Sequence, residues 1–143
     1  MDRSSLILAA LSPAKSVPHT PVQIQKMLFL LDKNVSKEIG GPHFNFQPYD
    51  YGPFDQAVYV VLEELATKNL VSISEELGRR WKTYSLTADG QKAGENLLKQ
   101  LDNKTQHYLV KLSEFVLSLS FAQLVSAIYK AYPDMKVRSV FKE

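Results

Sequence analysis

Residues 58–98 read VYVVLEELATKNLVSISEELGRRWKTYSLTADGQKAGENLL, a helical pattern followed by an alternating pattern and then by a second helical pattern. Gly52-Pro53 precedes the stretch, and we expect a helix over residues 53–68 that begins there. Its apolar residues recur at helical spacing, which predicts a core-facing stripe: Phe54, Val58, Val61, Leu62 and Leu65. This helix therefore packs on other helices through one face and leaves the other free.

The middle of the stretch predicts a β-hairpin. Val71 and Ile73 alternate with serines, Gly78 lies at the turn, and Arg80–Leu86 is rich in residues that favour strands. Thr87 is then positioned to cap a helix that runs to about residue 101.

On the N-terminal side the sequence predicts two helices. The first covers residues 3–11 and ends at Ser12-Pro13. The second begins at Thr20-Pro21-Val22-Gln23, where the Thr and Gln are spaced as in a capping box. Its apolar stripe comprises Ile24, Met27, Leu28, Leu31 and Val35. Because Phe29 and Leu30 lie on other faces, we expect this helix to be central, with neighbours on more than one side.

The remaining segments add one strand and two helices. Phe44 and Phe46 alternate with polar residues and predict a short strand. A helix is expected near residues 104–119. Ser120-Phe121-Ala122-Gln123 forms a second capping box, which starts a helix that Pro133 ends. These two C-terminal helices either pack on the rest of the chain or form a dimer interface.

The predicted order is helix, helix, short strand, helix, two-stranded hairpin, helix. This order indicates an α+β fold of the winged helix-turn-helix type, in which the hairpin is the wing, with a mostly helical C-terminal extension. We assign residues 1–103 to the winged-helix domain and residues 104–143 to an extension packed on the same domain.

Three segments also resemble a known family. IQKMLFLLDK (24–33), FNFQPYDYGPFDQAVYVVLEELATKNLV (44–71) and IYKAYPDMKVRS (128–139) are similar to the YwgA-like family of small winged-helix proteins. More distantly, the Tyr-Gly-Pro before a helix resembles the SocA-like (Panacea) antitoxin domain. The YwgA-like resemblance covers most of residues 20–138. It implies the fold and no particular activity.

Composition limits the classes of protein without selecting one. The chain has 143 residues, 45% of them hydrophobic, and a net charge of +2, so it forms about one globular domain with no overall charge bias. It has no cysteine, which excludes disulfides and thiolate metal sites. The apolar run at residues 6–11 is too short to span a membrane, so we expect a cytoplasmic protein without a membrane partner.

The nucleic-acid-binding residues predicted from this fold lie on the third helix and on the hairpin. Gln56 and Tyr59 belong to the exposed face of the helix that usually enters the major groove. The hairpin contributes four more residues: Arg79, Arg80, Trp81 and Lys82. However, residues 53–69 carry a net charge of −2, which weakens phosphate binding by the helix itself. Alternatively, Glu75 and Glu76 pair with the arginines and leave an ordinary solvated hairpin.

Other chemistries have little support. The three histidines are not at ligand spacing, and the sequence contains neither a nucleophile elbow nor a phosphate-binding loop. We therefore expect no catalytic residues, no metal and no cofactor. Tyr49, Tyr51 and Phe54 are either a peptide-docking surface or aromatics that pack a strand on the core, and we favour the packing role.

The favoured interpretation is a DNA-binding transcriptional regulator or accessory factor that is not an enzyme. The alternative is a non-enzymatic protein-binding adaptor or antitoxin-like module with the same fold. The partners that these interpretations allow are double-stranded DNA, a protein, or a second copy of the chain.

Overall fold

The computed structural model describes residues 1–75, 78 and 81–142. Within them the chain is α+β, with six α-helices, two short 3₁₀ helices and two antiparallel sheets of two strands each. The helices are α1 (Arg3–Leu11), α2 (Pro21–Asn34), α3 (Ala57–Thr67), α4 (Ala88–Lys99), α5 (Asn103–Ser118) and α6 (Phe121–Ala131). The remaining elements are η1 (Ser12–Ala14), η2 (Pro133–Lys136), β1 (Gln47–Tyr49), β2 (Gly52–Phe54), β3 (Val71–Ser74) and β4 (Thr83–Leu86).

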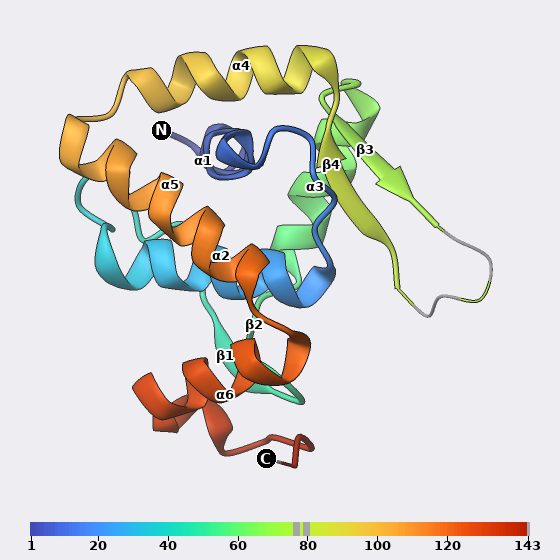
Figure 1. The fold of residues 1–143 in the computed structure, drawn as a ribbon, viewed down its shortest axis with the longest axis vertical. Helices are drawn as coiled ribbons and strands as arrows, with labels where there is room; N and C mark the ends of the chain where they lie inside the picture. Colours follow the sequence, from blue (N-terminus) through green and yellow to red (C-terminus); the bar gives the residue numbers. More distant parts are fainter. Residues whose placement is uncertain (76–77, 79–80, 143) are drawn as a thin grey trace.

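The helix α1 covers the predicted residues 3–11 and lies in the middle of the group formed by α2, α3, α4 and α5. Figure 1 shows it end-on, with α4, α5, α2 and α3 around it. All six residues from Leu6 to Leu11 are buried, so α1 presents apolar side chains in every direction. Gly94 allows α4 to approach closely, because a Cβ atom there would lie 2.4 Å from the carbonyl oxygen of Leu8.

The helix α2 begins at the predicted capping box. Thr20 Oγ1 accepts a hydrogen bond from the Gln23 amide at 3.2 Å, and Gln23 Oε1 accepts one from the Thr20 amide at 2.8 Å. Phe29 is buried between Phe46 and Tyr132, whose ring centroids lie 5.6 and 4.9 Å from its own. Two faces of α2 are therefore covered by the chain itself, which confirms its central place.

The segment between α2 and α3 differs from the prediction. Gly52-Pro53 does not start a helix but belongs to β2, which pairs with β1 so that Tyr49 lies opposite Gly52. Gly52 has φ +108°, a conformation that glycine adopts readily and that the tight hairpin requires. The helix α3 begins at Ala57 instead, where Asp55 Oδ1 accepts from the Ala57 amide at 2.9 Å.

The expected strand at Phe44 and Phe46 is also displaced, because β1 begins only at Gln47. Asp32 on α2 accepts from the backbone amides of His43 and Phe44 at 2.9–3.0 Å, which ties this segment to the helix instead of to a strand. The Phe44 side chain is buried and lies 5.7 Å from the Phe46 ring.

The second hairpin is confirmed, with Val71 opposite Leu86 and Ser74 opposite Thr83. His19 adds an isolated antiparallel bridge to β4 of this hairpin. Its backbone exchanges two hydrogen bonds, of 2.8 and 2.9 Å, with the backbone of Tyr84. The His19 ring is fully buried. Its Nδ1 donates to the Val17 carbonyl at 3.0 Å, whereas Nε2 has no partner among the described residues. Desolvation by burial lowers the His19 pKa below its ordinary value.

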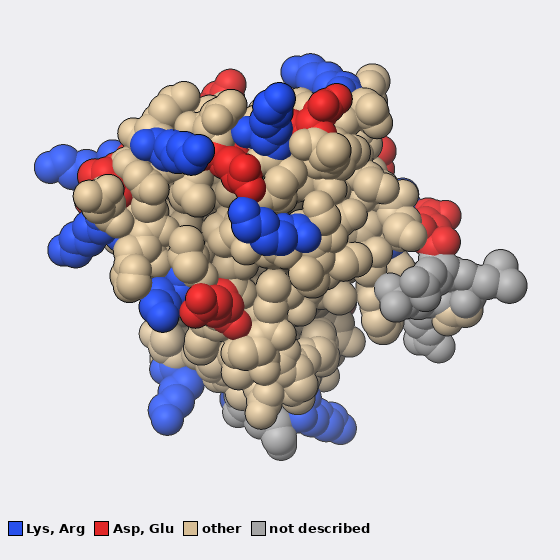
Figure 2. Space-filling view, turned by 45° about the horizontal axis from the view of Figure 1, so that its top comes forward, with Lys and Arg blue, Asp and Glu red and all other residues tan. Residues whose placement is uncertain are grey.

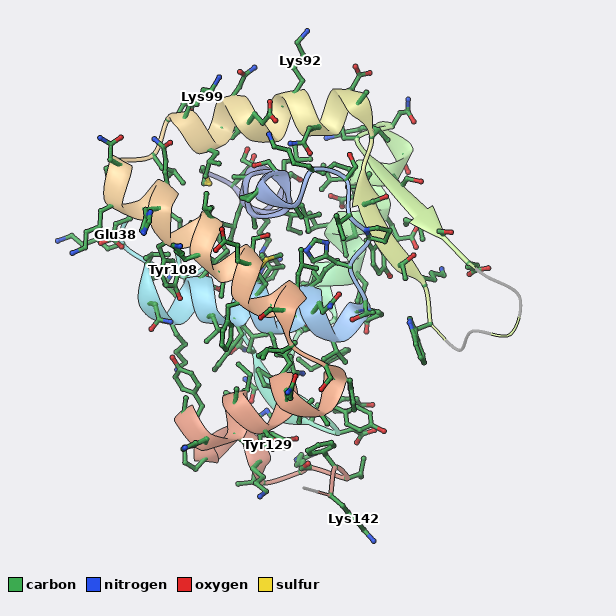
Figure 3. All side chains as sticks on the ribbon, in the orientation of Figure 1. Glu38, Lys92, Lys99, Tyr108, Tyr129 and Lys142 are labelled. Carbon is green, nitrogen blue, oxygen red and sulfur yellow. The ribbon has the colours of Figure 1, made fainter. Side chains whose placement is uncertain are left out.

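A lysine is buried on the side of α2 that faces β2 and α6. Lys26 is 3% exposed, and its Cε and Nζ atoms each lie 3.4 Å from where a Cβ atom on Gly52 would lie. Tyr129 of α6 approaches the same point to 3.4 Å, and Figure 3 shows Tyr129 on the helix that closes this end of the molecule. Burial lowers the pKa of the Lys26 ammonium from 10.5 to about 7.

The C-terminal helices pack on the rest of the chain. Ser120 and Gln123 form the predicted second capping box at the start of α6. Asn34 at the end of α2 donates to the Tyr108 hydroxyl of α5 at 2.9 Å, and Figure 3 shows Tyr108 above that helix. The Tyr129 hydroxyl donates to Ser139 Oγ at 2.7 Å, and the Val140 amide donates to the Asp50 carbonyl at 3.0 Å. Residues 121–140 thus cover the β1–β2 hairpin.

Candidate functional site

Four of the six predicted site residues surround one groove between α3 and the β3–β4 hairpin. This α3 groove has a volume of about 470 Å³. It is lined by Gln56, Tyr59, Val60, Glu63, Trp81 and Lys82, together with Pro21 and Tyr84. The other two predicted residues, Arg79 and Arg80, lie outside the described residues. The structure therefore brings the helix and the hairpin together as the fold prediction requires.

The charge of the α3 groove is not that of a basic surface. Lys82 Nζ lies 3.6 Å from a carboxylate oxygen of Glu63 and 3.6 Å from one of Glu75. The helix α3 carries Glu63 and Glu64 and no basic residue. On the face shown in Figure 2, Lys and Arg side chains lie scattered among Asp and Glu side chains. Glu75 therefore approaches Lys82, whereas the alternative prediction paired Glu75 and Glu76 with Arg79 and Arg80, and Glu76 and both arginines lie outside the described residues.

Aromatic rings form the floor of the α3 groove. The half-buried Tyr59 ring lies 5.8 Å from Phe54 and is stacked at 6.3 Å on Tyr84 of β4. Burial raises the pKa of both tyrosine hydroxyls, and the Glu63 carboxylate adds to the rise at Tyr84. Both phenols therefore stay neutral, and the negative charge of Glu63 acts on the groove.

Val60 and Trp81 leave the rim of this groove apolar, since their side chains are 52% and 50% exposed. Gln56 lies at the N-cap position of α3, where its side chain makes no capping hydrogen bond. It is exposed, as predicted.

A second groove adjoins the first and was missed by the sequence analysis. This α6 groove has a volume of about 560 Å³ and shares Pro21 and Trp81 with the α3 groove. Its other lining residues come from α2, the β1–β2 turn and the start of α6: Thr20, Val22, Gln23, Tyr51, Leu119, Ser120, Phe121 and Leu124. The capping boxes at residues 20–23 and 120–123 predict where both helices begin, but no local signal shows that the two beginnings meet.

The aromatic residues around Gly52 lie in a different environment from the one predicted. Tyr49 and Tyr51 are 51% and 40% exposed, so their assignment to core packing is wrong. Tyr51 lies 5.1 Å from the ring of Phe121, which is itself 47% exposed. Tyr49 is stacked at 4.8 Å on Phe54, which is half-buried. Exposed aromatics of this size are typical of binding surfaces.

The described residues form neither a metal site nor a membrane-spanning helix. Among residues 1–75, 78 and 81–142, no three His, Asp or Glu side chains lie close enough together to hold a metal ion. In the same residues, no helix has both the length and the apolar character needed to cross a bilayer.

Comparison with known proteins does not assign the chain to a family. Neither the models of known protein families nor the curated proteins give a match to this chain. The resemblance to the YwgA-like family stays a prediction.

Proposed function

We propose that this chain is a non-enzymatic protein-binding module with a winged-helix fold, and that the α3 and α6 grooves together form its docking surface. The order of α2, α3 and the β3–β4 hairpin supports the winged-helix assignment. One observation carries the functional proposal. Trp81 stands half exposed between two adjoining grooves lined mainly by apolar and aromatic residues, and the cation beside it, Lys82, already faces two carboxylates.

This arrangement suits a protein partner better than a polyanion. Tryptophan and tyrosine supply large contact area at low entropic cost and are frequent in the centre of protein interfaces. Phosphate binding instead requires unpaired cations, because neutralising phosphates supplies most of the non-specific affinity for DNA. Glu63 and Glu64 on α3 repel a phosphate backbone at the position where a recognition helix would approach it.

A peptide selection tests the proposal. A phage-displayed random dodecapeptide library that lacks tryptophan is panned against the immobilised full chain. Trp81 is the only tryptophan, so its emission reports occupancy directly. We expect recovered peptides to shift Trp81 emission, and we expect Trp81→Ala to lose their binding, as measured with fluorescein-labelled peptides. Peptides that bind equally well to Trp81→Ala, or a selection without binders, would overturn the proposal.

Duplex DNA is the second candidate, and the specific observation in its favour is that Gln56 is exposed at the α3 groove beside Trp81 and Lys82. A glutamine there can pair with adenine in the major groove. Fluorescence anisotropy with a random duplex at several salt concentrations tests it. If DNA binds, Arg79→Ala with Arg80→Ala should lower the salt dependence by about one to two counterions. The absence of binding by the wild type at low salt would eliminate this candidate.

A further inference from the structure

The two grooves differ in charge although they share a wall. Among the described residues that line the α6 groove there is no ionisable group other than the hydroxyl of Tyr51. The α3 groove has Glu63 and Lys82 on its rim, and Glu64 is exposed on the same helix. A ligand that lies across Trp81 therefore meets an uncharged apolar surface on one side and the charged groups of Glu63 and Lys82 on the other.

The Glu63 carboxylate of the α3 groove retains its capacity for hydrogen bonding. The separation of 3.6 Å between Lys82 Nζ and Glu63 is longer than a hydrogen bond. The Glu63 side chain is 58% exposed, so a second cation can reach it from solvent. An arginine would approach such a carboxylate with two parallel N–H donors, which a distant ammonium does not provide.

The aromatic rim favours the same kind of ligand. A guanidinium or ammonium group above the face of tryptophan or tyrosine is attracted by the ring quadrupole, and tryptophan is the strongest of these acceptors. Trp81 and Glu63 both line the α3 groove, so a cation bound in the groove can approach both groups. Glu63 also raises the pKa of Tyr84, after the larger effect of burial, which is a second sign of negative potential in this groove.

The α6 groove suits the apolar part of the ligand. Phe121 and Tyr51 form exposed aromatic walls, and the buried Leu124 contributes to its lining. A volume of about 560 Å³ lies within the range of small-ligand pockets and accommodates one large apolar side chain with its neighbours. An apolar anchor in a pocket of this kind dominates the affinity of most peptide complexes.

We propose that the partner presents a peptide segment with an arginine or lysine next to a large apolar side chain. The cation lies between Glu63 and Trp81 in the α3 groove, and the apolar side chain enters the α6 groove. This inference rests on the proposed protein-binding function and specifies the chemistry of the partner. In the α3 groove Glu63 would repel an acidic segment, and Lys82 there already lies 3.6 Å from the carboxylates of Glu63 and Glu75.

The peptides whose binding depends on Trp81 test the inference through their residue composition and through their affinity for variants of the protein. We expect these sequences to be enriched in a basic residue next to Leu, Ile, Met or Phe. In anisotropy titrations, Glu63→Gln should weaken a basic peptide about two- to fivefold, the effect of a partly exposed ion pair. Phe121→Ser should weaken it about tenfold or more, because the wall that contacts the apolar anchor is removed.

Controls separate this inference from the function on which it rests. Glu114→Gln removes an exposed carboxylate of α5 that pairs with Lys111 at 3.6 Å, outside both grooves, and should leave the affinity unchanged. Trp81-dependent peptides that show no basic enrichment, or that bind Glu63→Gln as well as wild type, would overturn the inference and leave the protein-binding function standing. A selection without Trp81-dependent peptides would overturn both.

Discussion

Replacing the buried lysine of α2 by methionine should stabilise the protein, and the gain should depend on pH. Lys26 is 3% exposed, and burial lowers its pKa from 10.5 to about 7. Between these two pH values the unfolded chain binds a proton at Lys26 that the folded chain does not bind. The free energy of unfolding therefore rises with pH across this window. Methionine has a similar shape and no charge, so Lys26→Met abolishes this dependence.

The size of the effect follows from the two pKa values. A tenfold change in proton affinity corresponds to about 1.4 kcal/mol. The change from 10.5 to about 7 therefore gives a full penalty of about 5 kcal/mol, which is reached below pH 7. Between pH 7 and pH 9 the penalty falls by about 2 kcal/mol. We therefore expect the stability difference between Lys26→Met and wild type to shrink by about 2 kcal/mol over that interval.

Urea denaturation at pH 6, 7, 8 and 9 measures this difference, with Lys37→Met as the control. Lys37 is exposed in the turn after α2, so its replacement should leave the pH dependence of wild type intact. If the stabilities of Lys26→Met and wild type ran parallel from pH 7 to pH 9, Lys26 would retain an ordinary proton affinity in the fold, and the reasoning would be refuted.

Other residues give further predictions. Thr20→Ala should cost about 1 kcal/mol of unfolding free energy in urea, because the α2 capping box loses an acceptor; an unchanged midpoint would contradict this role. Phe29→Asp should prevent folding, seen as loss of the far-ultraviolet helical signal, because the side chain is buried within the chain; a folded Phe29→Asp monomer would instead identify an interface. Gly94→Ala should destabilise by about 1–3 kcal/mol, since its Cβ would lie 2.4 Å from the Leu8 carbonyl oxygen, and a gain from helix propensity would mean that the helices separate easily. Burial lowers the His19 pKa, so the unfolded state binds more protons below pH 6.5 and wild type should lose stability as the solution is acidified. In denaturation at pH 7 and pH 5, His19→Gln should show a smaller loss, and an equal loss would assign it to other groups.

The sequence predicts the helices well because their boundaries are encoded locally. Thr20 with Gln23 and Ser120 with Gln123 cap the two helices that they were expected to cap, and Thr87 caps α4. These bonds span three residues and depend little on the tertiary structure. The β3–β4 hairpin was predictable for a similar reason, since alternation and a turn are properties of adjacent residues.

The wrong and missing predictions concern positions where tertiary contacts decide the local structure. Gly-Pro is a common helix start, but here Gly52 adopts a positive φ in a hairpin. The Gln25 side chain binds the backbone amide and the backbone carbonyl of Asp55, each at 3.0 Å. Asp55 then accepts from the Ala57 amide, so the helix begins at Ala57. The position of Lys26 in α2 suggested nothing unusual, because its burial comes from β2 and α6. The α6 groove joins residues 20–23 with residues 119–124, and only the packed chain shows this.

The central position of α1 has a consequence for synthesis. Residues 6–11 pack most extensively on α4, which begins only at Ala88 and ends at Lys99. At usual translation rates of roughly 5–20 residues per second, the synthesis of α4 is complete only roughly 5–20 s after this apolar run has been made. Throughout that time the nascent chain displays a contiguous apolar segment, the kind of sequence that binds chaperones or associates with other chains. Ribosome-bound fragments that end before Lys99 should therefore aggregate or recruit chaperones in proportion to their dwell time, whereas the released chain should not.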